Sequence, residues 1–209
     1  MDFIKRIFRS KNISLVIFLF LRKMILPLKT ISKSLPDSGE FLEVGCGHGI
    51  ISYFLSTDKQ KRSIIAIDPD KKRISYALNI FDKIPNLTFE NKKFSEDDQK
   101  IYDVIIFFGV LYLFNDEDLI SILKLARKKL KSGGVIYISD LKRDDSLTYK
   151  FHVLREKVLK KINFTKGNII KGRKEDEWFE ILNNIGFNNT QKVNASVFLH
   201  STMDIKAFK

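Results

Sequence analysis

The feature that most constrains this chain is an apolar run that leads directly into closely spaced glycines. Residues 41–50 read FLEVGCGHGI, in which an apolar segment suited to a buried strand is followed by Gly45, Gly47 and Gly49. Glycine lets the backbone bend sharply and approach a ligand without a Cβ in the way. A helix that follows such a turn offers N–H groups without intrahelical partners. The pattern therefore predicts a strand, a tight turn and a helix, with a ligand site at the turn.

The segments after this turn alternate in the manner of a parallel α/β sheet. The run at 102–108 is apolar throughout, as expected of a strand that is buried on both faces. Two closing segments, near 190–199 and 203–208, look like final strands, with a hairpin as one arrangement. The other strands are expected at 41–45, 63–68, 86–91 and 135–140, and helices near 49–57, 71–81, 119–130 and 177–187.

Length and composition favour one compact domain, because 209 residues with 44% hydrophobic content can bury a sizeable core. Cys46 is the single cysteine, which excludes an intramolecular disulfide, and the three histidines show no metal-ligand spacing. We therefore expect no metal site. The chain opens without a signal-peptide pattern, so we expect a cytoplasmic location.

Residues 1–34 form a basic and apolar segment ahead of a domain at 35–209. The first 36 residues hold eight basic groups and only one acid, Asp2. Their apolar stretch, Ile13 to Leu21, is too short to span a bilayer, which needs about twenty residues. We expect one or two helices, which either pack on the domain or lie in a membrane interface with their cations toward anionic headgroups.

A second basic segment, residues 141–174, interrupts the α/β pattern with eleven basic groups and three acids. We expect acceptor contacts in this insertion, and the alternative is a solvated helix face with a loop. The net charge of +12 suggests nucleic acid, an anionic membrane or an acidic substrate as a partner. The abundant lysine, isoleucine and asparagine are also expected of a chain encoded in an AT-rich genome, in which case the charge has no functional meaning.

Three features are predicted to lie together, because ligands of open α/β sheets bind at the carboxyl ends of the strands. They are the turn at 45–49, Asp68 at the end of the second strand, and the end of the fourth strand at Phe108 and Gly109. An acid about twenty residues after a glycine turn is placed to accept hydrogen bonds from ribose hydroxyls. The three features indicate a ligand that contains a nucleoside.

In order and in motif, these residues resemble the class I S-adenosylmethionine-dependent methyltransferase family. Glu43 and the three glycines match its E/D-x-G-x-G-x-G pattern, and residues 65–70 match its acidic second strand. Residues 102–114, 125–140 and 177–187 resemble its later elements, so the resemblance covers roughly residues 35–209. It implies a Rossmann-like seven-stranded, mostly parallel sheet with helices on both faces, an antiparallel final strand, and an extra N-terminal helix.

The resemblance implies that S-adenosyl-L-methionine is the cofactor and methyl donor. Glu43 would help to hold its methionine amino group. The backbone of Gly45, Cys46, Gly47 and Gly49 would lie against the amino-acid and ribose portions, and Asp68 would bind the ribose hydroxyls.

The resemblance also assigns the adenine contacts. Pro69 and Phe94 would flank the adenine, and Phe108 and Gly109 would complete the cofactor site. Lys93 stands where many relatives carry an aspartate that reads the adenine amino group. Lysine cannot accept a hydrogen bond, so this contact differs here.

A sulfonium methyl donor is already activated, so the protein mainly aligns the acceptor and excludes water. If the acceptor is a hydroxyl, a general base helps, and Tyr112, Asp140 and His152 are the catalytic candidates. The alternatives are that Tyr112 lines the pocket, that Asp140 caps a loop, and that His152 is an exposed helix residue.

We expect methyl transfer to a small-molecule or lipid-like acceptor. The only thiol lies in the cofactor turn, which argues against cysteine-dependent methylation of pyrimidines. The N/D-P-P-F/Y signature of adenine and glutamine methylation is absent, and the glycine spacing differs from that of nicotinamide dehydrogenases. RNA is an alternative acceptor that charge supports without a recognition motif. A non-catalytic methyltransferase-like binding module is the other alternative.

Overall fold

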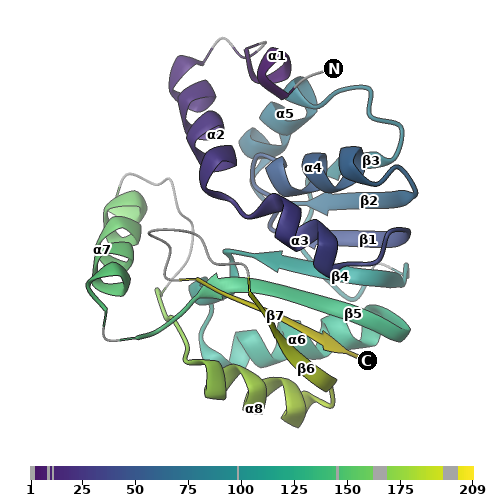
Figure 1. The fold of residues 1–209 in the computed structure, drawn as a ribbon, viewed down its shortest axis with the longest axis vertical. Helices are drawn as coiled ribbons and strands as arrows, with labels where there is room; N and C mark the ends of the chain where they lie inside the picture. The colour runs from purple at the N-terminus through teal and green to yellow at the C-terminus, as the bar shows by residue number, and fades with distance from the viewer. Residues whose placement is uncertain are drawn as a thin grey trace. The chain divides into compact units, whose positions relative to one another are not determined.

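The strands of the computed structural model belong to one seven-stranded sheet in the order β3-β2-β1-β4-β5-β7-β6 (Figure 1). The structure describes residues 3–8, 10, 12–97, 99–144, 146–161, 169–194 and 202–209. The chain divides into a first unit, residues 1–94, and a second unit, residues 95–209. The predicted division into residues 1–34 and 35–209 stays a prediction.

In the first unit the predicted apolar runs form parallel strands, with β2 between β1 and β3. Because the three strands run in the same direction, their carboxyl ends lie at one edge, where the glycine turn and Asp68 follow β1 and β2. The elements are α1 (Phe3–Ile7), α2 (Ile13–Ile25), α3 (Leu28–Ser34), β1 (Gly39–Val44), α4 (Ile50–Asp58), β2 (Arg62–Ile67), α5 (Lys71–Ile80) and β3 (Leu87–Glu90).

The N-terminal segment forms three described helices, α1 to α3, so the expectation of one or two was wrong. Asn12 begins α2, because its side chain accepts a hydrogen bond from the Leu15 N–H at 3.1 Å. Pro27 separates α2 from α3, since proline has no N–H with which to continue a helix. These two positions divide one apolar stretch into separate helices.

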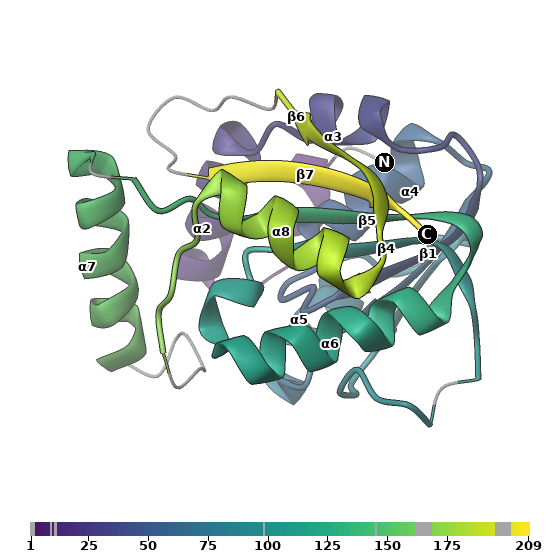
Figure 2. The ribbon, with the colours of Figure 1, turned by 90° about the horizontal axis from the view of Figure 1, so that it is seen from below.

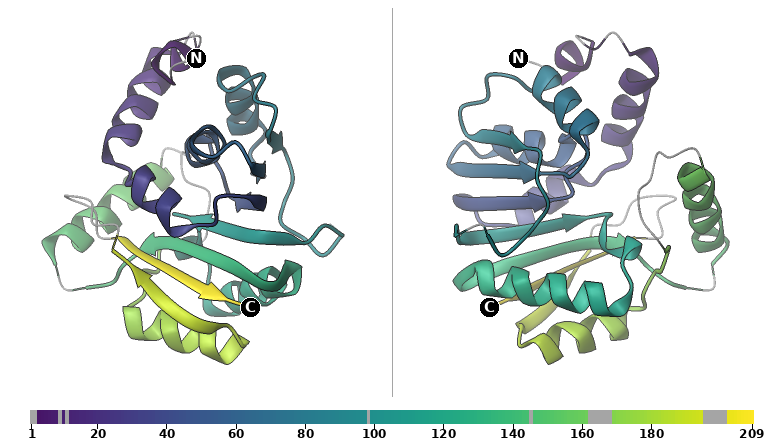
Figure 3. Two further views of the ribbon diagram at one scale, coloured as in Figure 1. Left: turned by 45° about the vertical axis from the view of Figure 1, so that its right-hand side comes forward. Right: turned by 180° about the vertical axis from the view of Figure 1, so that it is seen from behind.

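The three helices pack on the rest of the first unit. Phe3 of α1 lies against Tyr53 and Phe81, with ring centroids 5.7 and 6.0 Å apart. The buried Arg62 guanidinium, at the start of β2, donates to the hydroxyl and carbonyl oxygens of Ser32 in α3. Figure 3 shows α3 beside α4, in agreement with their contacts.

In the second unit β4 and β5 are parallel, and β7 lies between β5 and β6 and is antiparallel to both. The helices α6 and α8 lie side by side (Figure 2). The elements are β4 (Tyr102–Phe108), a 3₁₀ turn η1 (Leu111–Leu113), α6 (Asp116–Lys129), β5 (Leu130–Leu141), α7 (Leu147–Lys161), α8 (Glu175–Ile185), β6 (Asn188–Val193) and β7 (Thr202–Phe208).

The predicted fold class is confirmed, including the antiparallel final strand. The predicted hairpin is confirmed as the antiparallel pair β6 and β7, although β6 begins at Asn188 and ends at Val193. Residues 195–199 of the predicted strand lie outside the described residues. β5 is longer than expected, because it begins at Leu130, directly after α6.

The insertion at 141–174 contains α7, which stands beyond the carboxyl end of β5 (Figures 1 and 2). This helix buries His152 and Glu156 and exposes Leu147, Phe151 and Leu154. Two polar side chains of the helix are thus buried, while three large apolar ones are exposed together with Lys150 and Lys157. Residues 162–168 of the insertion lie outside the described residues.

Candidate active site

The glycine turn joins β1 to α4 through three backbone positions with positive φ. Gly45, Gly47 and Gly49 have φ values of 75°, 57° and 77°, in the left-handed region that favours glycine. At Gly49 a Cβ would also lie 2.5 Å from Cζ of Phe89, whereas at Gly47 it would meet nothing within 4 Å. Gly49 is thus required by packing as well as by conformation.

Asp68 follows β2 and holds the glycine turn in place. Its Oδ2 accepts a hydrogen bond from the Gly47 N–H at 2.9 Å, and its Oδ1 accepts one from the Asp70 N–H at 2.8 Å. The side chain is buried, and both carboxylate oxygens point to backbone groups of the two loops that end β1 and β2. The structure therefore brings together Asp68 and the glycine turn, as expected from the sequence.

Glu43, the acid of the motif, lies buried in β1 and contacts the first turn of α4. Its Oε2 accepts hydrogen bonds from both the backbone N–H, at 3.0 Å, and the hydroxyl of Ser52. Burial raises the pKa of Glu43 to about 7, while the two bonds from Ser52 and the charge of Arg22 oppose the rise. The carboxylate thus anchors the start of α4, and its contact with a methionine amino group stays a prediction.

The remaining side chains of the turn are not suited to acid–base or nucleophilic chemistry. Burial raises the pKa of the Cys46 thiol well above its usual range, so the thiol stays protonated. Burial and the nearby charges of Arg73 and Arg22 lower the pKa of His48 to about 4. The neutral His48 ring lies 5.7 Å from the ring of Phe18 in α2 and 6.1 Å from that of Tyr76.

The predicted adenine contacts follow neighbouring strands of the first unit. Pro69 comes two residues after the end of β2 and is exposed, and Phe94 follows β3 and is half-buried. Because β2 and β3 pair in parallel, both residues follow the same edge of the sheet. Lys93 is exposed.

In the second unit Phe108 ends β4, and Gly109 turns the chain after it. Gly109 has a φ of 63°, and its N–H donates to the carbonyl oxygen of Ser139 at 2.7 Å. This bond ties the end of β4 to β5, one residue before Asp140. Two regions that the sequence analysis singled out are thus neighbours.

Asp140, at the carboxyl end of β5, is a buried carboxylate with one oxygen left unpaired. Its Oδ1 accepts the N–H of Leu141 at 2.8 Å, and its Oδ2 has no hydrogen-bond partner among the described residues. Burial raises the pKa of Asp140 to about 7, and the Leu141 N–H, the charge of Arg173 and the Tyr112 N–H oppose the rise. A carboxylate with this pKa is suited to take a proton near neutral pH.

The other two catalytic candidates lie on η1 and α7. The Tyr112 hydroxyl donates to Oε2 of Glu156 at 3.0 Å, and Glu156 lies one helical turn after His152. His152 is buried, so the alternative of an exposed helix residue is wrong. His152 and Glu156 are four residues apart on α7, so they lie on the same, buried side of the helix.

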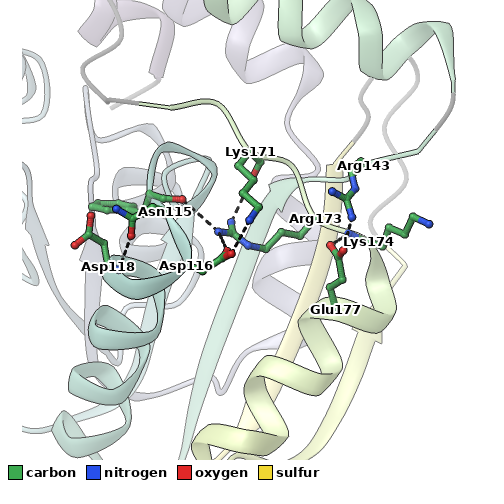
Figure 4. Close-up of polar contacts among 9 residues, drawn as sticks. Asn115, Asp116, Asp118, Arg143, Lys171, Arg173, Lys174 and Glu177 are labelled. Atoms are coloured by element: carbon green, nitrogen blue, oxygen red, sulfur yellow. Dashed lines mark hydrogen bonds and ion pairs between the residues drawn. The ribbon is translucent and has the colours of Figure 1, made fainter.

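Several cations of the basic insertion form ion pairs within the second unit (Figure 4). Lys171 and Arg173 both contact Asp116, at 2.6 and 2.9 Å, and Arg143 pairs with Glu177 of α8. The hydrogen bonds from Lys171 and Arg173 lower the pKa of the Asp116 carboxyl. Arg173 is itself buried, so this part of the predicted acceptor region has a structural role.

Sequence reasoning missed three residues at these sites. Glu156 accepts the hydrogen bond that the Tyr112 hydroxyl donates, and its spacing of four residues from His152 was an available signal. Phe18 and Arg22 of α2 lie near the glycine turn, where Phe18 contacts His48 and the charge of Arg22 acts on Glu43. No motif in the sequence links α2 to that turn.

Comparison with known proteins identifies the family of this chain. A family model described as a methyltransferase domain matches residues 17–192. The chain is similar to the ubiquinone biosynthesis O-methyltransferase of Aliivibrio fischeri, with 26% identity over 58% of this chain and 51% of that protein.

Two solved structures share the fold. Human N-acetylserotonin methyltransferase in complex with SAM has a TM-score of 0.70 at 17% identity, covering 87% of this chain and 51% of that one. An O-methyltransferase family 2 protein from Planctomyces limnophilus, in complex with apigenin, has a TM-score of 0.69 at 16% identity, covering 87% and 57%.

This chain spans about half the length of each of these three proteins. The family model, in contrast, covers most of this chain, including the glycine turn, Asp68 and Asp140. The chain belongs to the methyltransferase-domain family and has the class I S-adenosylmethionine-dependent methyltransferase fold.

Proposed function

We propose that this protein transfers the methyl group of S-adenosyl-L-methionine to a hydroxyl oxygen of a small-molecule acceptor. The observation that carries the proposal is Asp140, a buried carboxylate at the end of β5 with an unpaired Oδ2. A hydroxyl is a poor nucleophile until a base takes its proton. A buried carboxylate with a pKa of about 7 is well matched to that task.

The first unit has groups that fit the donor. Asp68 uses one acceptor position on each oxygen for the Gly47 and Asp70 N–H groups, so each oxygen keeps a lone pair for a ribose hydroxyl. The space at the Gly47 Cβ position is open, so a ligand can approach the backbone there. Gly49, the N-cap of α4, has no side chain to cap the helix, and Glu43 accepts the N–H of Ser52 in its first turn. The positive end of the helix favours a further negatively charged group, such as the donor's carboxylate.

When bound, the donor supplies a methyl group on a positively charged sulfur. The residues of the chain orient this group and the acceptor, and exclude water from both. The Asp140 carboxylate takes the hydroxyl proton as the acceptor oxygen becomes methylated. Tyr112 and Glu156, linked by their hydrogen bond, and His152 line the acceptor side in this proposal.

The relatives support the class of acceptor. The Aliivibrio fischeri relative is named an O-methyltransferase, and the Planctomyces limnophilus protein is in complex with apigenin, a small molecule that carries hydroxyl groups. A lipid-like acceptor with a hydroxyl group belongs to the same proposal. The cytoplasmic location stays a prediction from the sequence.

The experiment uses the full chain, isotopically labelled donor, and a panel of phenols, alcohols and amines, with products identified by mass spectrometry. We expect methyl ethers, and Asp140→Asn should lower kcat by about 10²- to 10⁴-fold. Below pH 7 the wild-type rate should fall as Asp140 becomes protonated, and this pH dependence should be absent in the variant. His152→Asn and Tyr112→Phe serve as comparison variants.

Two results would contradict the proposal. One is methylation of amines alone, since these need no such base. The other is an Asp140→Asn variant with the wild-type kcat and pH profile on a hydroxyl acceptor.

A further inference from the structure

The outer side of α2 exposes a continuous row of large apolar side chains. Among the described residues, eight of the exposed large apolar side chains fall within residues 4–25, and five of them form what we call the α2 outer face. Their spacing of four, three, one and three residues places them on one side of the helix. They are Ile13, Ile17, Phe20, Leu21 and Met24, with Ile13 and Met24 the most exposed at 74% and 71%.

The opposite side of α2 packs against the rest of the first unit. Leu15, Val16 and Leu19 are buried, and Phe18 contacts His48 of the glycine turn. This packing fixes the rotation of the helix, so the outer face cannot turn inward to be buried. α2 therefore has large apolar side chains on both its buried and its exposed side, and we expect the exposed ones to be covered as well.

The charge of this segment indicates which kind of partner covers the α2 outer face. The described part of residues 3–34 contains no acidic residue and six cations, of which Lys5, Lys29 and Lys33 are exposed. An apolar helix face within a basic segment is the pattern of a helix that lies in the plane of an anionic membrane surface. The 13 residues of α2 extend about 20 Å, which suits a position along the surface.

The helices described by the structure include none that is long and apolar enough to cross a membrane.

A second copy of the chain is a less favourable partner for the α2 outer face than a membrane surface. A symmetric contact through α2 would place the same basic segment on both sides of the interface, where like charges repel.

We propose that the α2 outer face docks on the surface of an anionic lipid bilayer, with the helix axis along the surface. The apolar side chains enter the boundary between headgroups and acyl chains, and the exposed lysines contact anionic headgroups. This inference concerns binding alone, so it stands or falls independently of the proposed methyl transfer.

Deletion of residues 1–34 is a poor test, because it removes Phe3 and the Ser32 partners of the buried Arg62. The better variant is the double substitution Ile17→Gln and Leu21→Gln, which changes exposed positions and keeps helix propensity. The matched control is Leu78→Gln, since Leu78 is an exposed apolar residue of α5 in the same unit, at 51%.

The full chain is sedimented with vesicles of phosphatidylcholine alone and with vesicles that contain equal parts of phosphatidylcholine and phosphatidylglycerol. We expect binding to the anionic vesicles, weakened by added salt, at least tenfold weaker for the double variant and unchanged for Leu78→Gln. Absence of wild-type binding, or equal binding by the double variant, would overturn the proposal. So would a stable wild-type dimer, seen by analytical ultracentrifugation, that the double variant dissociates.

A gain-of-signal variant guards against misfolding of the double variant. Met24→Trp places a fluorophore on the outer face, whereas the single natural tryptophan, Trp178, is buried. Docking should shift its emission to shorter wavelength when anionic vesicles are added. An unshifted emission maximum at saturating vesicles would count against docking.

Discussion

At the scale of single residues, buried carboxylates organise the proposed site. Asp68 and Glu43 each accept a backbone N–H from the glycine turn or from α4, so they fix the backbone that a ligand would meet. Asp140 differs, because one of its oxygens has no partner among the described residues. A polar group buried without a partner is costly, and a reaction that uses the group is one explanation for keeping it.

Two of the three glycines of the turn, Gly47 and Gly49, give a matched pair of substitutions. Gly49→Ala forces alanine into the left-handed backbone conformation and brings its Cβ into a clash with Phe89. We expect a loss of about 3 kcal/mol in the free energy of unfolding. Gly47→Ala adds only the conformational cost of about 1 kcal/mol, since its Cβ would meet nothing within 4 Å. Urea unfolding measures both values, and equal losses would show that the contact with Phe89 is unimportant.

Asp140 should also make stability depend on pH. Its pKa is raised to about 7 in the folded state, so between about pH 4 and pH 7 the folded chain keeps a proton that the unfolded chain has lost. Stability from this group is therefore present at low pH and is lost as pH rises toward 7.

Asparagine does not ionise, so the Asp140→Asn variant should not lose this stability as pH rises toward 7. Its unfolding free energy, relative to wild type, should increase by about 1.4 kcal/mol per pH unit between pH 5 and pH 7. Denaturant unfolding of both proteins across that range provides the measurement. A difference that stays constant with pH would mean that Asp140 ionises normally.

At the scale of elements, the sequence predicted the strands and turns that apolar runs and glycine spacing specify. The buried strands β1, β2 and β4 appear within two residues of their predicted bounds, because continuous apolar runs specify them. The site residues that directly follow these strands were predicted for the same reason. Asp68 and the glycine turn are neighbours because parallel strands end at the same edge.

The elements that were mispredicted depend on other signals. The beginning of β5 at Leu130 was missed because Ser132, Gly133 and Gly134 are typical of a helix end. The role of Glu156 was missed because α7 buries this acid and His152 while it exposes Leu147, Phe151 and Leu154. Hydrophobic periodicity assigns such a helix the wrong inward face.

The attachment of α3 to β2 gives a prediction at this scale. The Arg62 guanidinium donates hydrogen bonds to main-chain oxygens of Ser32, Leu35 and Pro36. The Arg62 side chain is fully buried. Arg62→Met leaves these oxygens without their partner, and we expect a loss of about 3 kcal/mol or more.

The control for this variant is Lys59→Met. Lys59 forms an exposed ion pair with Asp37 at 3.2 Å, which contributes less than about 1 kcal/mol. Thermal and denaturant unfolding should therefore separate the two variants clearly. If Arg62→Met unfolds like Lys59→Met, the buried hydrogen bonds of Arg62 do not hold α3 to the first unit.

At the scale of the whole chain, the net charge of +12 has more than one origin. Lys171, Arg173 and Arg143 form ion pairs inside the second unit, so they contribute to its structure. Arg6 of α1 likewise pairs with Asp82, whereas Lys5, Lys29 and Lys33 are exposed in a described segment that contains no acidic residue. The net charge by itself therefore does not indicate a single function for all the basic residues, such as binding to nucleic acid.

The central claim is that the glycine turn and Asp68 bind S-adenosyl-L-methionine, and calorimetric titration of the full chain with this compound tests it most directly. We predict one site in the wild type, the same affinity in Asp140→Asn, and a loss of affinity of at least tenfold in Asp68→Ala, which removes the proposed ribose acceptor. A wild-type chain that fails to bind, or an Asp68→Ala variant that binds with wild-type affinity, would contradict the account.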